Sequence, residues 1–289
     1  MKRLFNRQSV VFIGLTLFLV LYRLGFLYGI PDLFGAVAAC LLVLAFGKGT
    51  GGTIRLQKTD RRMTAPVFFA ALGIMFVTQA LSGQVYKLEE LLLNRFGWTM
   101  YTGEPEIPPL FVSENTARTF AGLYAILVGP LVEELLYRGY AAQTFRTNSG
   151  KLAVILLSGI AFSIGHGRLY LWMHTFFAGA VFAYIAIEYS FKWAVILHII
   201  NNLWATIGDL VLMMTLGESV GNLVSLGIAA VFGVIALIVC LKNRKGITDY
   251  VKGNRSEKGT YPSAFFNFGF LLFLAFNLWK TVNALAPVS

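Results

Sequence analysis

Charged residues are scarce in this chain, and their scarcity excludes most classes of soluble protein. Asp, Glu, Lys and Arg make up 13% of the 289 residues, whereas 57% are hydrophobic and the mean hydropathy is +0.69. A soluble globular domain carries about twice that share of charged residues. The composition is therefore typical of a polytopic membrane protein.

Cysteine and strand-like alternation are also rare or missing. The two cysteines, Cys40 and Cys240, fall in or near apolar segments and form neither a disulfide framework nor a metal-binding motif. Short segments of alternating polarity, which a membrane β-barrel requires, do not occur, so the spans are expected to be helices. Because no small-residue cleavage site follows the basic start of the chain, the first apolar run is expected to be a retained span.

We predict an all-α, polytopic transmembrane helical bundle that forms a single integral membrane domain over residues 1–289. Several apolar runs approach or exceed the roughly 20 residues that cross a bilayer as a helix. About eight or nine spans are expected, and the cell membrane is the expected location. The segments are 9–30, 33–47, 65–83, 117–145, 151–166, 169–189, 192–215, 219–241 and 263–285.

The net charge of +10 is concentrated in loops that flank the spans. Threading the spans puts the basic clusters on one side and the acidic loop 84–116 on the other, so the positive-inside rule predicts a cytoplasmic N-terminus. Nucleic acid is excluded as a partner, because no nucleic-acid-binding module surrounds these basic residues. The basic clusters are Lys2, Arg3 and Arg7; Lys48, Arg55, Lys58, Arg61 and Arg62; Arg138, Arg146 and Lys151; and residues 242–258. The acidic residues are Glu89, Glu90, Glu104, Glu106 and Glu114.

Two segments outside the spans have a recognisable character. The apolar residues of Tyr86–Trp98 recur at helical spacing, which predicts an amphipathic helix along the membrane surface. Residues 243–261 are polar, charged and contain glycine, and they are expected to be a cytoplasmic linker.

A few ionisable side chains lie inside the apolar segments, where each costs roughly 2.5–3.5 kcal/mol on insertion scales and therefore points to function. Glu134 and Arg138 are four residues apart on one helix face and are expected to form an ion pair. Glu133 is rotated by about 100° around the helix and lacks this local partner. An unpaired carboxylate in an apolar cavity is a candidate general base.

Three further ionisable residues have simpler explanations. Arg23 lies toward the outer end of the first span and can snorkel to the surface. Asp209 lies in the outer half of its span and can cap a helix or pair locally. His174 lies in an aromatic stretch and is expected to be a packed, hydrogen-bonded residue rather than a catalytic one.

His166 is expected at the same depth as Glu133. If the helices on either side of residues 147–150 form an antiparallel hairpin, Glu133 lies about 21 Å and His166 about 24 Å from the turn. His198 and Asn202 are four residues apart and share one face of a later span. One plane could then hold a carboxylate, two imidazoles and an amide, which together can activate water and stabilise an oxyanion.

Three motifs in a fixed order carry a resemblance to a known family. They are Glu133-Glu134-Leu-Leu-Tyr-Arg138, Phe162-Ser-Ile-Gly-His166 and His198-Ile-Ile-Asn201-Asn202, and Pro130 and Gly139 fit the flanks of the first. Through them, residues 117–205 resemble the catalytic core of the CAAX prenyl endopeptidase and bacteriocin-processing family of membrane proteases, also called CPBP or Abi. The first three and the last two expected spans lie outside this resemblance.

The resemblance implies an endopeptidase that acts on a peptide or protein substrate at the lipid bilayer. It implies that Glu133 activates water and that His166 helps to orient it. It further implies that His198 and Asn202 stabilise the tetrahedral oxyanion.

The other motif residues, Glu134 and Arg138, are implied to be structural or to position the substrate. No cofactor is expected. Glu133, His166 and His198 could ligate zinc in principle, but a metal-free glutamate mechanism accounts better for the amide in the third motif.

Two other functions make different predictions. A transporter that uses the buried charges as an ion relay predicts repeated, broken spans in matching positions, and the sequence contains no such repeat. A non-catalytic membrane scaffold or immunity protein of the same fold predicts loss of the motifs, and all three are present.

Overall fold

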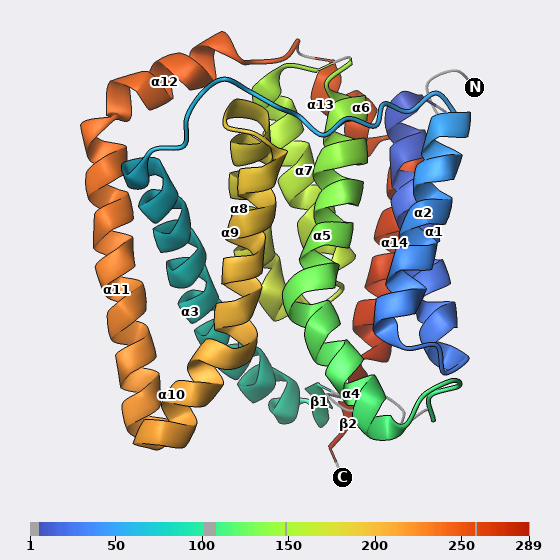
Figure 1. Cartoon of the computed structure of the whole chain (residues 1–289), viewed down its shortest axis with the longest axis vertical. Coiled ribbons are helices and arrows are strands. Elements are labelled where there is room, and N and C mark those ends of the chain that lie inside the picture. Colours follow the sequence, from blue (N-terminus) through green and yellow to red (C-terminus); the bar gives the residue numbers. More distant parts are fainter. Residues whose placement is uncertain (1–5, 101–107, 148, 258, 289) are drawn as a thin grey trace.

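The described part of the chain forms a bundle of helices with one short sheet (Figure 1). The computed structural model describes residues 6–100, 108–147, 149–257 and 259–288. The charged residues of the expected clusters that lie outside this part of the chain are Lys2, Arg3, Glu104, Glu106 and Lys258.

Most of the described chain is helical. The helices are α1 (Arg7–Leu27), α2 (Asp32–Gly49), α3 (Ala65–Arg95), α4 (Glu114–Leu123), α5 (Gly129–Glu134), α6 (Ala142–Phe145), α7 (Lys151–Gly165), α8 (Trp172–Glu188), α9 (Phe191–Leu203), α10 (Asp209–Leu216), α11 (Glu218–Lys242), α12 (Arg244–Gly253), α13 (Thr260–Phe265) and α14 (Phe268–Asn283). The π-helical segments are Tyr124–Val128, Leu135–Ala141 and Trp204–Gly208, and Leu169–Leu171 is a 3-10 turn. The strands β1 (Trp98–Met100) and β2 (Leu285–Pro287) pair antiparallel, with Thr99 opposite Ala286.

Seven helical segments of the described chain are long and apolar enough to cross a membrane. They are Arg7–Leu27, Asp32–Gly49, Ala65–Arg95, Glu114–Phe145, Leu169–Glu188, Phe191–Leu216 and Glu218–Lys242. The prediction of an all-α, multi-pass membrane protein is confirmed at this level. Each expected span contains an apolar helix, but α7 and α14 have only 15 and 16 residues and fall short of full spanning length.

Two segments differ from the sequence-based expectation. No separate surface helix begins near Tyr86, because α3 continues without a break to Arg95 as one helix of 31 residues. The expected linker over residues 243–261 contains α12 and the start of α13. In α12 the apolar residues Ile247, Tyr250 and Val251 recur at helical spacing, a signal that polar composition conceals.

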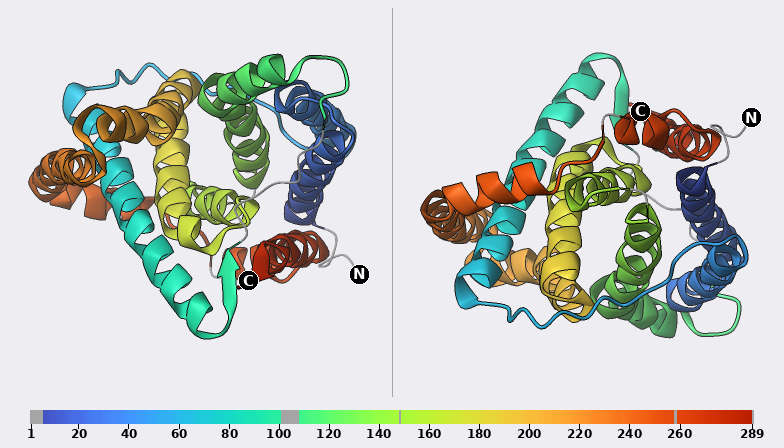
Figure 2. Two further views of the ribbon diagram at one scale, coloured as in Figure 1. Left: turned by 90° about the horizontal axis from the view of Figure 1, so that it is seen from below. Right: turned by 90° about the horizontal axis from the view of Figure 1, so that it is seen from above.

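Three helices at the centre of the bundle carry the motifs or support them. Viewed from its ends, α5, α7 and α8 lie between the group of α1, α2 and α14 and the pair of α3 and α11 (Figure 2). The helices α7 and α8 pack closely because glycines face each other. A Cβ at Gly179 would lie 3.1 Å from the Cα of Gly159, which is closer than nearly all side chains tolerate.

A buried aromatic cluster ties the first and last helices to this centre. The Phe12 ring lies 5.6 Å from Phe145, 5.1 Å from Phe270 and 5.6 Å from Phe273, measured between centroids. Each such pair contributes about 0.5–1.5 kcal/mol beyond the burial of its area. This packing fixes α1 and α14 beside α7, where they close one side of the cavity described below.

Hydrogen bonds and an ion pair connect the segments that meet at the end of the bundle where α3 and α9 begin. The loop after α2 crosses this end, and its backbone donates from Arg55 to the Gly139 carbonyl at 2.8 Å. Glu188, at the end of α8, accepts from Lys151 at 2.7 Å and from the Tyr250 hydroxyl at 2.9 Å. Burial and the nearby Glu188 carboxylate raise the pKa of Tyr250. Helix α12 is therefore docked rather than loose.

Candidate active site

The helix that carries the first motif is irregular on both sides of it. Helix α5, with Glu133 and Glu134 at its end, lies between the π-helical segments Tyr124–Val128 and Leu135–Ala141. Single π turns inside α-helices occur frequently at functional sites, because they shift the side chains that follow them around the axis.

Pro130 explains how one of these irregular turns is held. The Gly129 N–H bonds to the Tyr124 carbonyl with π spacing, and the next bond would join residue 130 to the carbonyl of Ala125. Proline has no N–H, so that carbonyl would be left without its helical partner. The side-chain amide of Asn202 supplies the missing donor, with its nitrogen 2.9 Å from the Ala125 oxygen. Helix α9 is thus fixed against the turn that precedes the motif.

Glu134 is the buried centre of the motif residues. Its side chain is 0% exposed, and one oxygen, Oε1, accepts from Arg138 Nη1 at 2.7 Å and lies 2.8 Å from His198 Nδ1. The prediction of an ion pair between Glu134 and Arg138 is confirmed. Because an ionised carboxylate only accepts, Nδ1 of His198 carries a proton in this contact, and Nε2 is left for other chemistry.

Arg138 contacts neighbours from other helices, although its Nε has no hydrogen-bond partner among the described residues. Its Nη2 donates to the Gly179 carbonyl at 2.9 Å, and its guanidinium lies over the rings of Phe162 and Phe182, 4.6 and 5.2 Å from their centroids. The ring of Phe182 also stacks on His198, with centroids 4.6 Å apart. These contacts favour a structural role for the arginine beside the glutamate and the histidine.

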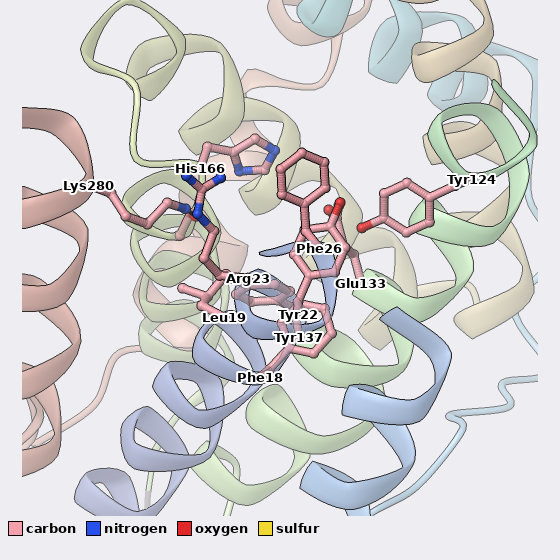
Figure 3. Close-up of a pocket in the computed structure, with 11 residues that line it drawn as sticks. Phe18, Leu19, Tyr22, Arg23, Phe26, Tyr124, Glu133, Tyr137, His166 and Lys280 are labelled. Carbon is pink, nitrogen blue, oxygen red and sulfur yellow. Dashed lines mark hydrogen bonds between the residues drawn. The ribbon is translucent and has the colours of Figure 1, made fainter. Parts of the chain in front are cut away.

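Glu133 faces a different environment from its neighbour. Its side chain is 23% exposed and lines a cavity of about 190 Å³ together with His166 (Figure 3). The hydroxyl of Tyr124 and the Glu133 carboxylate point into the same space in that view. His198 on α9 also lies close to Glu133. Its Nε2 is 3.5 Å from the Oε2 atom of Glu133.

His166 is held in one tautomer by the backbone. Its Nδ1 lies 2.7 Å from the Phe162 carbonyl oxygen. A carbonyl only accepts, so Nδ1 carries the proton and Nε2 is an acceptor in the neutral ring. The ring also packs edge-on against Phe162, with centroids 4.6 Å apart. A neutral imidazole fixed in this way can orient a water molecule beside the Glu133 carboxylate.

The structure thus brings most of the expected site residues together. Glu133 and His166 share one cavity, and His198 contacts both glutamates. Asn202 is on the same face of α9 as His198, but its nitrogen is engaged by Ala125. An amide nitrogen has two hydrogens, so one remains for another acceptor.

Several cavity residues were not expected from the sequence. Arg23 was assigned a snorkelling role, but it lines the cavity beside Glu133 and His166, as does Lys280 from α14. The sequence does contain one signal that Arg23 belongs to the site, because an ionisable residue inside a span usually faces the bundle interior. Nothing in the sequence placed α14 against α7. The cavity is otherwise largely aromatic, through Phe18, Tyr22, Phe26, Tyr124 and Tyr137.

The simpler expectations for two other residues agree with the structure. His174 is buried, and its Nδ1 lies 3.0 Å from the hydroxyl of Thr78 on α3. Asp209 accepts a hydrogen bond from Ser225 at 2.6 Å. Both are satisfied by a helical neighbour.

The donor set does not form a ready metal site. Among the described residues, no three or more His, Cys, Asp or Glu side chains are grouped so that they could hold a metal ion. Because no such group is present in this part of the chain, we derive no catalytic step through a metal.

Comparison with known proteins supports the resemblance. Residues 115–204 match the model of the family described as Type II CAAX prenyl endopeptidase Rce1-like, which is a protease family. The matched segment runs from α4 to the end of α9 and contains all the motif residues discussed above. No curated protein and no solved structure matches the chain.

Proposed function

We propose that this protein is a membrane-embedded endopeptidase of the CAAX protease type, which hydrolyses a peptide bond in a membrane-associated peptide or protein. The observation that carries the proposal is the pairing of Glu133 and His166 in one cavity within a transmembrane bundle. The adjacent Glu134 is closed off by Arg138 and His198, which leaves one glutamate for chemistry.

In the proposed reaction Glu133 acts as a general base. It takes one proton from a water molecule that Nε2 of His166 orients, and the water oxygen bonds to the carbonyl carbon of the substrate. When the C–N bond of the tetrahedral intermediate breaks, the same proton passes from Glu133 to the amine that leaves. One water is consumed and two peptide ends are formed.

His198 and Asn202 are proposed to stabilise the oxyanion. The carboxylate of Glu134 accepts from Nδ1 of His198, which directs Nε2 of the ring away from Glu134, and the Nε2–H of the imidazolium form is the proposed donor to the developing negative charge. The second N–H of the Asn202 amide is the other proposed donor. The aromatic walls of the cavity suit an apolar stretch of the substrate, and the proposed location is the cell membrane.

The test compares the purified protein with Glu133→Gln on a panel of fluorogenic, membrane-associated peptides. Glutamine is nearly isosteric but cannot accept the proton from water, so turnover is expected to be abolished. Glu218→Gln is the matched control, because this glutamate is exposed at the start of α11. Equal product yield from the wild type and Glu133→Gln would remove the proteolytic assignment.

A chelator arm tests the metal-free form of the mechanism. Chelators are expected to leave turnover intact, and no stoichiometric zinc is expected to co-purify. A tightly bound zinc that is lost in His198→Ala, together with inactivation by chelators and recovery on adding zinc, would contradict this form.

A further inference from the structure

A second cavity lies at the end of the bundle where α3 and α9 begin, and no motif residue lines it. Figure 1 shows this end of the bundle. It encloses about 330 Å³ between the loop residues 59–63 and the start of α9. Three cations line it, Arg61, Arg62 and Lys192, together with one carboxylate, Asp60. The proposed proteolytic mechanism uses none of these residues.

A buried hydroxyl without a partner opens onto this cavity. Ser190 lines it and is 6% exposed, and its Oγ has no hydrogen-bond partner among the described residues. Serine at the N-cap of a helix ordinarily accepts from the first turn, but Ser190 makes no such bond to α9. Its φ of 125° is also unusual for a residue with a side chain. The hydroxyl is therefore a buried, unsatisfied polar group in the wall of the cavity, and a ligand that hydrogen-bonds to it would relieve the cost of its burial.

The cationic side chains leave the cavity with an excess of positive charge. Arg61 is partly engaged, because it lies over the Tyr189 ring at 4.6 Å and 3.7 Å from a Glu188 oxygen. Arg62 and Lys192 are both exposed at the rim. Two cations, a hydroxyl donor and the N-terminal dipole of a helix of 13 residues together suit a phosphate group.

We propose that this cavity binds the phosphate of an anionic phospholipid headgroup. The apolar flank favours a lipid over a free anion. Trp193 lines the cavity and packs against Phe68, with ring centroids 6.1 Å apart. Further along the same two helices, Phe69 and Ile196 are 42% and 39% exposed, so acyl chains can run along α3 and α9 from the headgroup.

The test measures binding of dioctanoyl phosphatidylglycerol to the full chain held in phosphatidylcholine nanodiscs. Arg62→Gln with Lys192→Gln should weaken binding by about 25-fold, because each cation near an anionic headgroup contributes about 1 kcal/mol, or roughly a factor of five in affinity. Ser190→Ala should weaken it as well, without lowering the melting temperature in phosphatidylcholine alone. The matched control is Arg244→Gln with Lys245→Gln, a pair of exposed cations at the same end of the bundle on α12, which should leave affinity unchanged.

Three results would overturn the proposal. The first is an unchanged affinity in the Arg62 and Lys192 double variant. The second is an equal loss in the α12 control, which would mean that the surface attracts anions without a site. The third is equal stabilisation of the protein by inorganic phosphate at the same concentration, which would assign the cavity to a free anion.

Discussion

Two adjacent glutamates have opposite environments because a helix turns by about 100° per residue. Glu134 points into packed protein, where Arg138 and His198 share its Oε1 atom. Glu133 points to the aromatic cavity and keeps 23% of its side chain exposed. We therefore propose that Glu134 belongs to the scaffold of the site and that Glu133 carries out its chemistry.

The first residue-scale prediction concerns Arg138. Arg138→Ala leaves Glu134 as a buried charge without its cation and empties the space between Phe162 and Phe182. Breaking a buried pair in this way costs about 3–5 kcal/mol, so thermal unfolding in detergent should shift strongly downward. Arg244→Ala, at an exposed position on α12, should leave the unfolding temperature unchanged. A fully stable but inactive Arg138→Ala would give the arginine a direct role in catalysis instead.

The sequence predicted residue contacts only where they are local. Glu134 and Arg138 lie one helical turn apart, so their ion pair follows from spacing alone. The contact from His198 to Glu134 joins residues 64 positions apart and depends on how α9 packs. Arg23 was interpreted as a snorkelling residue, because nothing local indicates that α1 borders the cavity.

At the scale of elements, two π-helical segments interrupt the long helix from Glu114 to Phe145 and determine where its motif residues point. Pro130 leaves the Ala125 carbonyl without a backbone donor, and the side-chain amide of Asn202 on another helix donates a hydrogen bond to it. In the second π segment the Gly139 carbonyl accepts from the Arg55 backbone N–H at 2.8 Å. Each irregular turn is thus stabilised by a partner outside its own helix, which holds the motif at a fixed angle.

The element-scale prediction separates the two roles of Asn202. Asn202→Ala should lower stability by about 1–3 kcal/mol, because a buried carbonyl loses its donor. It should also lower turnover by roughly 10²–10³ if the amide stabilises the oxyanion. Pro130→Ala returns a backbone N–H to the helix. The double variant should therefore regain stability in thermal unfolding but not turnover.

Recovery of turnover in that double variant would contradict the oxyanion assignment. It would mean that Asn202 acts on the reaction only by holding the π turn. Pro130→Ala alone provides the control, since it should keep turnover close to that of the wild type.

The positions of the spans could be predicted from hydropathy, but their exact ends and breaks could not. Long apolar runs indicate every helix of the bundle core, because a helix needs about 20 apolar residues to cross the hydrocarbon layer of a bilayer. The π turns were not predictable, since they depend on Asn202 and the loop after α2 supplying distant hydrogen bonds. The sequence predicts a linker at α12, because this helix has few apolar residues. The hydrogen bond from Tyr250 to Glu188, which docks α12, comes from another helix and leaves no local signal.

At the scale of the whole molecule, charge distinguishes the two ends. Basic residues of the loop after α2 and of α12 lie at one end, and the short sheet of β1 and β2 lies at the other (Figure 1). The positive-inside rule predicts that the basic end faces the cytoplasm.

Cysteine labelling tests this orientation in a background of Cys40→Ala and Cys240→Ala. A membrane-impermeant maleimide should label Leu110→Cys, near the opposite end, in intact cells. Lys252→Cys on α12 should react only after the cells are permeabilised, because its side chain is exposed on the basic end. Labelling in the reverse order would contradict the predicted topology.

The cavity itself is a property of the whole bundle rather than of the motif-bearing segment. Its walls come from α1 and α14 as well as from α5 and α7, although α1 and α14 lie outside residues 115–204. The sequence identified Glu133 and His166 through depth along a hairpin. It could not show that distant helices enclose them, because that depends on buried contacts such as Phe12 with Phe273.

The most direct test of the account measures turnover and thermal unfolding of Glu133→Gln and Glu134→Gln side by side. Glu133→Gln is expected to unfold near the wild-type temperature, because glutamine is nearly isosteric and this side chain is 23% exposed, and to show no turnover. Glu134→Gln is expected to unfold at a markedly lower temperature, since Arg138 and His198 lose their carboxylate. Retained turnover in Glu133→Gln, with loss of turnover in a fully stable Glu134→Gln, would contradict the account, because it would show that Glu134 and not Glu133 is the general base.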